Sequence, residues 1–208
     1  MNKIKEYQEI INSKIKQVRI QGKPDELYDP INYILSLKSK RVRPTLSILS
    51  YSLFKEDFNK ITEPSIALEF FHNFTLIHDD IMDNADIRRG KDTIHKKWNK
   101  NIGILSGDLL MIFAYKMLEN VDETIFKNTF KRYNNIAIKV CEGQQYDMNF
   151  EIKNEISEDD YLKMITLKTA VLIGFSLELG GLIANQEKQI TDQLYLAGEK
   201  IGISFQLM

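Results

Sequence analysis

The feature that most constrains the fold is a proline-free stretch that extends from Pro64 to the end of the chain. The four prolines occupy positions 24, 30, 44 and 64. Beyond Pro64, apolar residues recur at spacings of three and four, which is the periodicity of helices. Strands would show a sustained two-residue alternation bounded by tight turns, and the sequence has no such pattern. The gaps between helical patterns are short, for example KPDELYDP and FKEDFNK. We therefore expect one all-α domain over residues 1–208.

Three helix starts can be read directly from local residue patterns. Thr62-Glu63-Pro64 should open a helix that continues through Asp83, because proline is tolerated in the first turn of a helix. Pro44 should begin a second helix. Ser157 and Asp160 resemble a capping box before a third helix, from about Tyr161 onward.

Composition excludes several classes of function. A net charge of -1 gives no overall field that would attract nucleic acid or an acidic membrane. The single cysteine, Cys141, excludes an intrachain disulfide framework and suits a reducing compartment. There is no stretch of about 18 apolar residues, and the N-terminus lacks the apolar block of a signal peptide. We expect a cytoplasmic protein with no membrane span and no nucleic-acid partner.

An acidic cluster, HDDIMDNAD at residues 78–86, gives the strongest local signal. Asp79 and Asp83 are four residues apart and share a helix face, where like charges repel. They also lie at the C-terminal end of the helix, where the dipole disfavours anions. A bound hard cation would offset both penalties, and magnesium is typically shared with substrate phosphates. Arg88 and Arg89 follow, and their guanidinium groups suit the same phosphates.

For the DDxxD pattern alone, the alternative is a solvated acidic helix end. The preceding run EFFHNFTLI favours the cation site, because surface acids rarely follow a helix that is apolar around most of its circumference.

A basic cluster precedes the helix that Pro44 should begin. It consists of Lys38, Lys40, Arg41 and Arg43, with no acid among them. The N-terminus of a helix carries free N–H groups and partial positive charge, so this loop is a candidate phosphate site. A solvated basic loop is the alternative.

Lys168 interrupts an apolar stripe in the run YLKMITLKTAVLIGF. The stripe consists of Tyr161, Met164, Ile165, Leu172 and Phe175. A lysine within it must extend to solvent or meet an anion. Gln144 and Asp147 share another helix face and are candidate partners for Lys168 or for metal-bound water, although a solvated polar face is the alternative. His72 lies seven residues before Asp79, close to the same stripe; an isolated histidine there is more often a core residue than a ligand.

Taken together, these segments resemble the trans-prenyl diphosphate synthases, which include farnesyl and geranylgeranyl diphosphate synthases. The resemblance covers most of the chain in the right order: SKRVRP (39–44), HDDIMDNADIRRG (78–90), NIGILSGDLL (101–110), GQQYD (143–147), KTA (168–170) and the final GISFQLM. It implies an isoprenoid synthase fold, in which antiparallel helices surround a central cavity, and usually a homodimer.

The resemblance also implies a role for each matching residue. Asp79 and Asp83, supported by Asp80, would hold magnesium, for which manganese is a possible substitute. The allylic diphosphate would be bound by Arg88, Lys168 and Gln206, and isopentenyl diphosphate by Lys40, Arg43, His72 and Arg89. Thr169 would lie beside the developing carbocation. Phe74 and Thr75 would form the cavity wall, with Phe74 limiting the product to C15 or C20.

The implied reaction joins isopentenyl diphosphate to an allylic diphosphate by ionisation, condensation and elimination. A class I terpene cyclase and a non-catalytic partner subunit are the alternatives. Two departures from the family pattern are visible: Lys38 and Ser39 stand where the family usually has two glycines, and the chain ends where the second aspartate-rich motif is expected. We expect from the latter that the chain is truncated before that motif.

Overall fold

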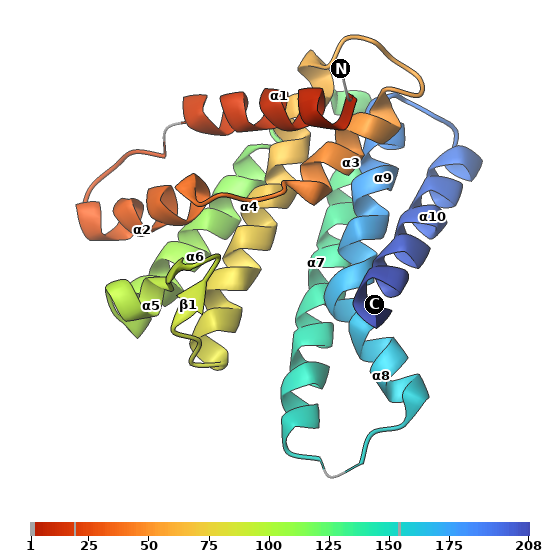
Figure 1. Ribbon diagram of the computed structural model, residues 1–208. Coiled ribbons are helices and arrows are strands. Elements are labelled where there is room, and N and C mark those ends of the chain that lie inside the picture. Colours follow the sequence, from red (N-terminus) through yellow and green to blue (C-terminus); the bar gives the residue numbers. More distant parts are fainter. Residues whose placement is uncertain (1–2, 19, 154) are drawn as a thin grey trace. The chain divides into compact units, whose positions relative to one another are not determined.

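The structure is a computed structural model that describes residues 3–18, 20–153 and 155–208. Almost all of its regular structure is helical (Figure 1), so the all-α prediction is confirmed. The chain forms two compact units. Unit 1 is built from residues 1–42 and 62–120, and unit 2 from residues 43–61 and 121–208. The assignment of the whole chain to a single domain stays a prediction.

Unit 1 is a group of helices with one short hairpin. Its helices are α1 (Lys3–Gln17), α2 (Asp25–Ser36), most of α4 (Asn59–Met82), α5 (Ile94–Lys97) and α6 (Lys100–Lys116). α4 begins three residues before the predicted start at Thr62, because the Asp57 carboxylate accepts a hydrogen bond from the Asn59 amide (3.1 Å). Residues 25–30 are helical as well, although the sequence suggested a gap there.

α4 is the most deeply buried helix of unit 1. Ile66 and Phe70 on one side and Leu68 on the opposite side are fully buried, and Phe71 is only 1% exposed. A helix that is apolar around its circumference belongs inside a protein core. Its C-terminal end nevertheless reaches the surface, where Asp83 is exposed. α4 therefore runs from the core to the surface and places the acidic cluster at its surface end.

The hairpin after α4 consists of β1 (Ile87–Arg88) and β2 (Lys91–Asp92), which pair antiparallel. Its two turn residues, Arg89 and Gly90, have φ of 54° and 75°. Positive φ at both central residues is the geometry of a type I′ turn, in which glycine is common and arginine is unusual. The turn sets where the two consecutive arginines stand relative to the acidic end of α4.

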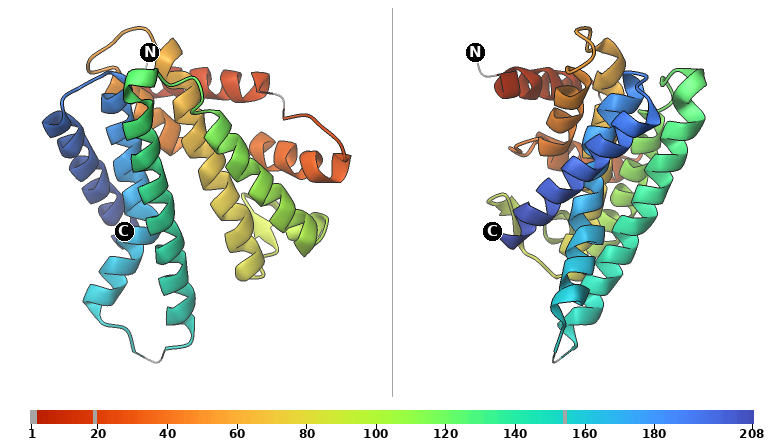
Figure 2. Two further views of the ribbon diagram at one scale, coloured as in Figure 1. Left: turned by 180° about the vertical axis from the view of Figure 1, so that it is seen from behind. Right: turned by 90° about the vertical axis from the view of Figure 1, so that its right-hand side faces the viewer.

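Unit 2 is a bundle of long helices (Figures 1 and 2). It contains α3 (Val42–Tyr51) apart from its first residue, α7 (Glu123–Glu151), α8 (Glu158–Ile165), the π-helical segment η1 (Thr166–Ala170), α9 (Val171–Ile183) and α10 (Lys188–Leu207). α9 is buried along its whole length and packs against α7 and α10. α8 has the N-cap that the sequence predicted, since the Ser157 hydroxyl accepts a hydrogen bond from the Asp160 amide (3.1 Å).

Small residues let α3 approach α9 closely. The hydroxyls of Ser47 and Ser50 donate hydrogen bonds of 2.8 Å to the carbonyl oxygens of Ser176 and Leu177. A Cβ atom added to Gly180 would lie 2.5 Å from the Ser47 carbonyl oxygen. These contacts fix α9 and therefore the η1 segment that precedes it.

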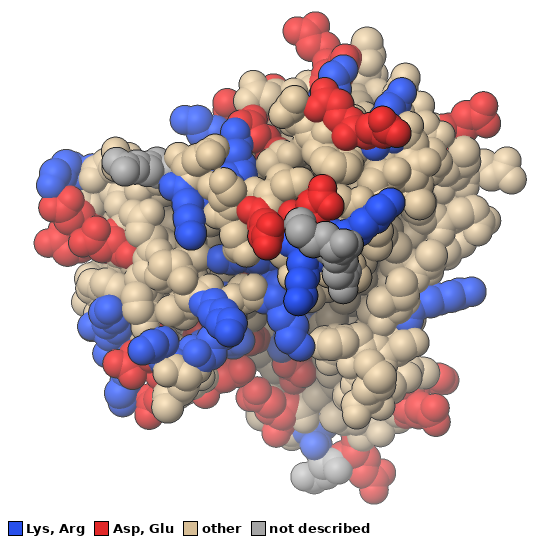
Figure 3. Space-filling view, turned by 45° about the horizontal axis from the view of Figure 1, so that its top comes forward, with Lys and Arg blue, Asp and Glu red and all other residues tan. Residues whose placement is uncertain are grey.

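The surface carries no broad area of one charge on the face drawn in Figure 3, where acidic and basic side chains are interspersed with uncharged ones. Among the described residues, one helical run, Glu158–Ile183, is long and apolar enough to cross a membrane by length and composition alone. Of its apolar window, 78% is buried inside the structure, and core helices commonly pass the same test. The absence of a membrane span stays a prediction.

Candidate active site

The acidic cluster lies at the end of α4 and just beyond it, and the three aspartates predicted to hold the metal differ in environment. Asp80 is 2% exposed, the Asp79 side chain is 17% exposed and Asp83 lies at the surface. The Asp83 amide donates to the Asp79 carbonyl (2.9 Å), so these two residues follow each other by one helical turn. Asn84, with φ of 49°, then ends the helix. Asp79 and Asp83 thus stand one above the other beside solvent.

Arg88 extends from the hairpin back to these aspartates. Its Nε lies 2.7 and 2.9 Å from the two carboxylate oxygens of Asp80, and its Nη2 lies 3.4 Å from an oxygen of Asp79. Burial raises the pKa of Asp80 although Arg88 acts in the opposite direction. Burial alone would lower the pKa of Arg88, but the hydrogen bond to Asp80 and the negative charges of the nearby aspartates together more than offset it, and the pKa rises. The Arg88 side chain remains 25% exposed, so a fixed cation stands at the acidic helix end.

The donor atoms in this cluster suit a hard cation. Carboxylate oxygens are the ligands that magnesium prefers, and cysteine is absent from this end of α4. No group of three or more His, Cys, Asp or Glu side chains is arranged to hold a metal within the described part of the chain. Asp80 is buried and bonded to Arg88, which leaves Asp79 and Asp83 as the accessible carboxylates among the three predicted metal ligands. A magnesium ion here would take its remaining ligands from water and phosphate.

The basic cluster divides into exposed and buried members. Lys38 and Lys40 are exposed, whereas Arg41 is 4% exposed. Arg41 donates through its three nitrogens to Glu69 (2.6 Å), to the Leu35 carbonyl (2.6 Å) and to Asn12 (3.3 Å). Its role in substrate binding stays a prediction, and these contacts support a structural role.

His72, Phe74 and Thr75 lie along α4 and are half-buried. The Phe74 ring packs against Phe71 (centroids 5.6 Å apart) and edge-on against His78 (4.8 Å). The Thr75 hydroxyl donates to the carbonyl of His72 (2.8 Å) within the same helix. Phe74 therefore belongs to an aromatic row on α4, and its role in limiting product length stays a prediction.

In unit 2, the run that the sequence presented as one helix contains a π-helical turn. Thr166–Ala170 forms η1 between α8 and α9. The widened turn lies against Gly143 of α7, where an added Cβ would be 2.6 Å from the Leu167 carbonyl carbon and from the Lys168 Cα. The added residue in this turn shifts the sequence spacing between the buried residues of α8 and those of α9. Tyr161, in the first turn of α8, is 40% exposed and outside the predicted apolar stripe, while Met164 and Ile165 are buried.

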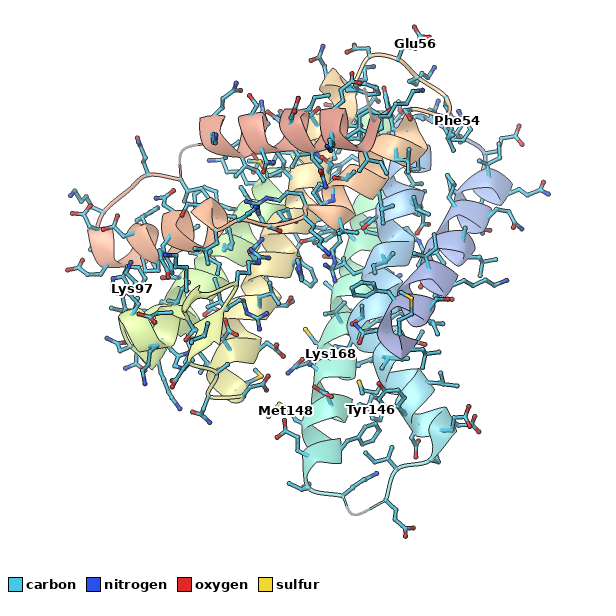
Figure 4. All side chains as sticks on the ribbon, in the orientation of Figure 1. Phe54, Glu56, Lys97, Tyr146, Met148 and Lys168 are labelled. Atoms are coloured by element: carbon cyan, nitrogen blue, oxygen red, sulfur yellow. The ribbon has the colours of Figure 1, made fainter. Side chains whose placement is uncertain are left out.

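Lys168 and Thr169 are presented by this π turn. Lys168 is labelled in Figure 4, and its ammonium lies 2.5 Å from a carboxylate oxygen of Asp147 on α7. Thr169 accepts a hydrogen bond of 3.2 Å from the Gln206 side-chain nitrogen on α10. Gln144 and Arg43 are half-buried in the same unit. Three helices of unit 2 thus bring four of the predicted site residues into two direct contacts.

Sequence reasoning missed two residues that contact the predicted site. Glu69 is 1% exposed and Asn73 is fully buried, and both lie on α4 beside Arg41 and Arg89. A signal was present, because Glu69 is an acid that precedes the apolar pair Phe70-Phe71 within a helix that was expected to be buried.

The chain is similar to known prenyl diphosphate synthases along its length. Residues 24–208 match the family described as Polyprenyl synthetase. A geranylgeranyl pyrophosphate synthase of Geoglobus acetivorans is 35% identical over 207 residues, which cover 98% of this chain and 65% of that protein. A geranylgeranyl diphosphate synthase of Methanosarcina mazei is 33% identical, with 100% of this chain and 64% of that protein covered.

Solved structures agree with the sequence relatives. A crystal structure of a geranylgeranyl pyrophosphate synthase superposes with a TM-score of 0.96 at 43% identity, covering 100% of this chain and 63% of that one. The Geoglobus acetivorans enzyme gives a TM-score of 0.94 at 34% identity, covering 98% and 67%. The predicted isoprenoid synthase fold is confirmed. The chain spans about two thirds of the length of these relatives, and it belongs to the polyprenyl synthetase family.

Proposed function

We propose that this protein is a prenyltransferase that joins isopentenyl diphosphate to an allylic diphosphate, head to tail, and forms a C15–C20 prenyl diphosphate. The names of its relatives support this reaction class, since they include geranylgeranyl diphosphate synthases and short chain isoprenyl diphosphate synthases. The observation that carries the proposal is the cation–carboxylate pair at the end of α4. Arg88 is anchored there by buried Asp80, beside the accessible oxygens of Asp79.

In this proposal, the end of α4 binds the allylic diphosphate. Arg88 donates to phosphate oxygens, and its bonds to Asp80 keep the guanidinium oriented before the substrate arrives. Asp79 and Asp83 would hold magnesium, with manganese as a substitute. When bound, the metal supplies positive charge that stabilises the leaving diphosphate. Because Asp80 already orients the Arg88 guanidinium in the folded protein, little further ordering of this side chain is needed when the substrate reacts.

The family resemblance assigns a role to the residues of the π turn as well. Lys168, oriented by Asp147, would stabilise negative charge on the leaving group, and the Thr169 hydroxyl would lie beside the allylic cation. The allylic carbon–oxygen bond breaks and its electron pair leaves with diphosphate. The double bond of isopentenyl diphosphate then forms the new carbon–carbon bond, and the departed diphosphate takes the proton that is lost. This series of reaction steps needs no nucleophile from the protein.

Product analysis tests the reaction class. The complete natural protein is incubated with isopentenyl diphosphate, an allylic diphosphate and magnesium, and the products are separated by chain length. Linear C15 or C20 diphosphates are expected, and Arg88→Ala should lower their rate of formation about 100-fold or more. A cyclic hydrocarbon from the allylic substrate alone would indicate a terpene cyclase. Product only after a second subunit is added would indicate a non-catalytic partner.

The proposed metal site has its own test. Two accessible carboxylates give an open and hydrated site, so magnesium should bind weakly to the protein alone and more tightly with a non-hydrolysable diphosphate analogue. Calorimetry with and without the analogue measures this difference, and Asp83→Asn should reduce it. Tight magnesium binding in the absence of the analogue would contradict the proposed sharing of ligands.

We also propose a homodimer and a cytoplasmic location. The near-neutral charge and the single cysteine, Cys141, support the location. Light scattering after size-exclusion chromatography measures the mass in solution, and a monomeric mass at micromolar concentration would overturn the dimer.

A further inference from the structure

A buried carboxylate in unit 1 connects the basic loop to the core. Glu69 is 1% exposed, and its Oε1 accepts a hydrogen bond of 2.6 Å from Arg41, which is 4% exposed. Buried charges are retained in proteins when each is paired and hydrogen-bonded. Arg41 also has a φ of 47°, a left-handed conformation that persists only where surrounding contacts hold it. Glu69 therefore fixes the backbone at the residue next to Lys40.

A second contact holds Lys40 itself. Its carbonyl oxygen accepts a hydrogen bond of 2.7 Å from the Gln8 side chain on α1. With Arg41 anchored on one side and this carbonyl on the other, the loop has little freedom where Lys40 leaves the backbone. The exposed ammonium group of Lys40 is thus carried by a fixed segment of chain.

The same carboxylate orients a second cation through Asn73. The Asn73 Nδ2 donates to Glu69 Oε1 (3.0 Å) and to the Glu69 carbonyl (2.7 Å). An ionised carboxylate can only accept hydrogen bonds, so it forces the nitrogen of the amide to face it. The amide oxygen must then point the other way, where it lies 3.5 Å from Nη1 of Arg89. Arg89 is the second residue here with a left-handed φ, at 54°.

Charge connects these groups as well as hydrogen bonding. Desolvation lowers the pKa of Arg89, and the Glu69 carboxylate is the strongest influence in the opposite direction. Arg41 acts with the desolvation, as a second positive charge nearby. The buried Glu69 carboxylate thus interacts with two arginines from different segments of unit 1, with Arg41 by direct contact and with Arg89 through its charge.

We infer that Glu69 is a positioning residue, which sets the placement of Lys40 through Arg41 and of Arg89 through Asn73. The inference rests on the proposed function, in which Lys40 and Arg89 bind isopentenyl diphosphate. Glu69 itself is buried, so it would act only through these neighbouring residues. Its loss should therefore weaken the use of isopentenyl diphosphate, while the allylic site around Arg88 is affected far less.

Steady-state kinetics of the complete protein test whether Glu69 positions Arg89 through Asn73. Asn73→Ala removes the partner of Arg89 but keeps the Arg41–Glu69 ion pair, so the fold should survive. The KM for isopentenyl diphosphate should rise about threefold to tenfold, and the KM for the allylic substrate should stay within about twofold. Ser65→Ala is the matched control, because Ser65 is also fully buried on α4 and bonds only to its own helix in the contacts seen. Equal changes in both KM values would overturn the inference.

A double-mutant cycle distinguishes positioning from general loosening. In an Arg89→Ala background, Asn73→Ala should cause no further rise in the KM for isopentenyl diphosphate. Additive effects of the two substitutions would refute the connection. Glu69→Gln should raise this KM about tenfold or more, since both cations lose their anchor. Circular dichroism identifies any variant that fails to fold. If Glu69→Gln fails to fold, the result for Asn73→Ala decides the question.

Calorimetric binding of isopentenyl diphosphate separates this inference from the proposed function. If the wild type forms no product, the proposed function fails, and the dissociation constant still decides the inference. A weaker dissociation constant for Asn73→Ala than for Ser65→Ala supports the positioning role. Equal constants, or no binding by the wild type, overturn it.

Discussion

Replacing Gly143 by alanine should displace the π turn that carries Lys168 and Thr169. A Cβ at this position would lie 2.6 Å from both the Leu167 carbonyl carbon and the Lys168 Cα, and closer still to the Lys168 amide nitrogen. All three atoms belong to the backbone, so no side chain can rotate away. To restore ordinary contact, α7 and η1 must separate by roughly 1 Å, since carbon atoms pack at about 3.5–4.0 Å.

The energetic cost follows from two opposing effects. Overpacking a well-packed site costs about 1–3 kcal/mol. Alanine is better than glycine in a helix interior by about 1 kcal/mol, which offsets part of that cost. Because the clash is with backbone, we expect the upper part of the range and a net loss of about 1–2 kcal/mol. For a chain of this size that lowers the melting temperature by roughly 2–8 °C, at about 2–4 °C per kcal/mol.

Thermal unfolding and condensation kinetics measure the two consequences. Gly103→Ala is the matched control, because an added Cβ there meets the terminal carbon of the flexible Ile81 side chain (2.8 Å). That side chain can move, so Gly103→Ala should melt at or above the wild-type temperature. In Gly143→Ala, kcat should also fall about tenfold or more, since Lys168 would leave its place beside Asp147. A melting temperature for Gly143→Ala at or above that of Gly103→Ala would refute the argument.

Three further predictions concern unit 1. Phe74→Ala should lengthen the products beyond C20, because loss of the ring leaves room for another isoprene unit; an unchanged product distribution would place the limit elsewhere. Asp80→Asn should raise the KM for the allylic substrate about tenfold, since Arg88 loses its charged anchor, and steady-state kinetics measure this. The pKa of Glu63 is lowered from 4.5, chiefly by its hydrogen bond from Lys14, so its carboxylate stabilises the fold above that pH. The stability advantage of wild type over Glu63→Gln in urea unfolding should therefore disappear as the pH falls below 4.5, and an advantage that grows on acidification would contradict it.

The helices were predictable where local chemistry alone determines them. Ser157 caps α8 as its sequence pattern indicated, because the capping bond involves only neighbouring residues. The start of α4 was placed too late, since Asp57 and its short-range hydrogen bond outweighed the usual signal of Pro64. Local patterns thus identify a helix more reliably than they identify its first residue.

The candidate site was predictable from residue types and their spacing, but its internal contacts were not. The carboxylates of Asp79 and Asp83 and the nearby arginines are visible in the sequence. The burial of Asp80 under Arg88 depends on how the hairpin folds back on α4, and the contact between Glu69 and Arg41 depends on how segments 28 residues apart pack. The π turn was equally hidden, because it arises from the close approach of α7 at Gly143 and not from the sequence of η1 alone.

The π turn also determines where this chain can change in length during evolution. A π-helical turn holds one residue more than an α-helical turn, so removing one residue from Thr166–Ala170 would close it to an ordinary turn with little rotation of α8 against α9. The packing of Met164 and Ile165 with Phe150 would survive, but Lys168 and Thr169 would lose the positions that the widened turn gives them. Elsewhere in α8 or α9 a single deletion would rotate one helix against the other by about 100° and would disrupt that packing. We expect natural variants to lose or gain residues in the exposed connection between α7 and α8 and to keep the number of residues in η1 constant.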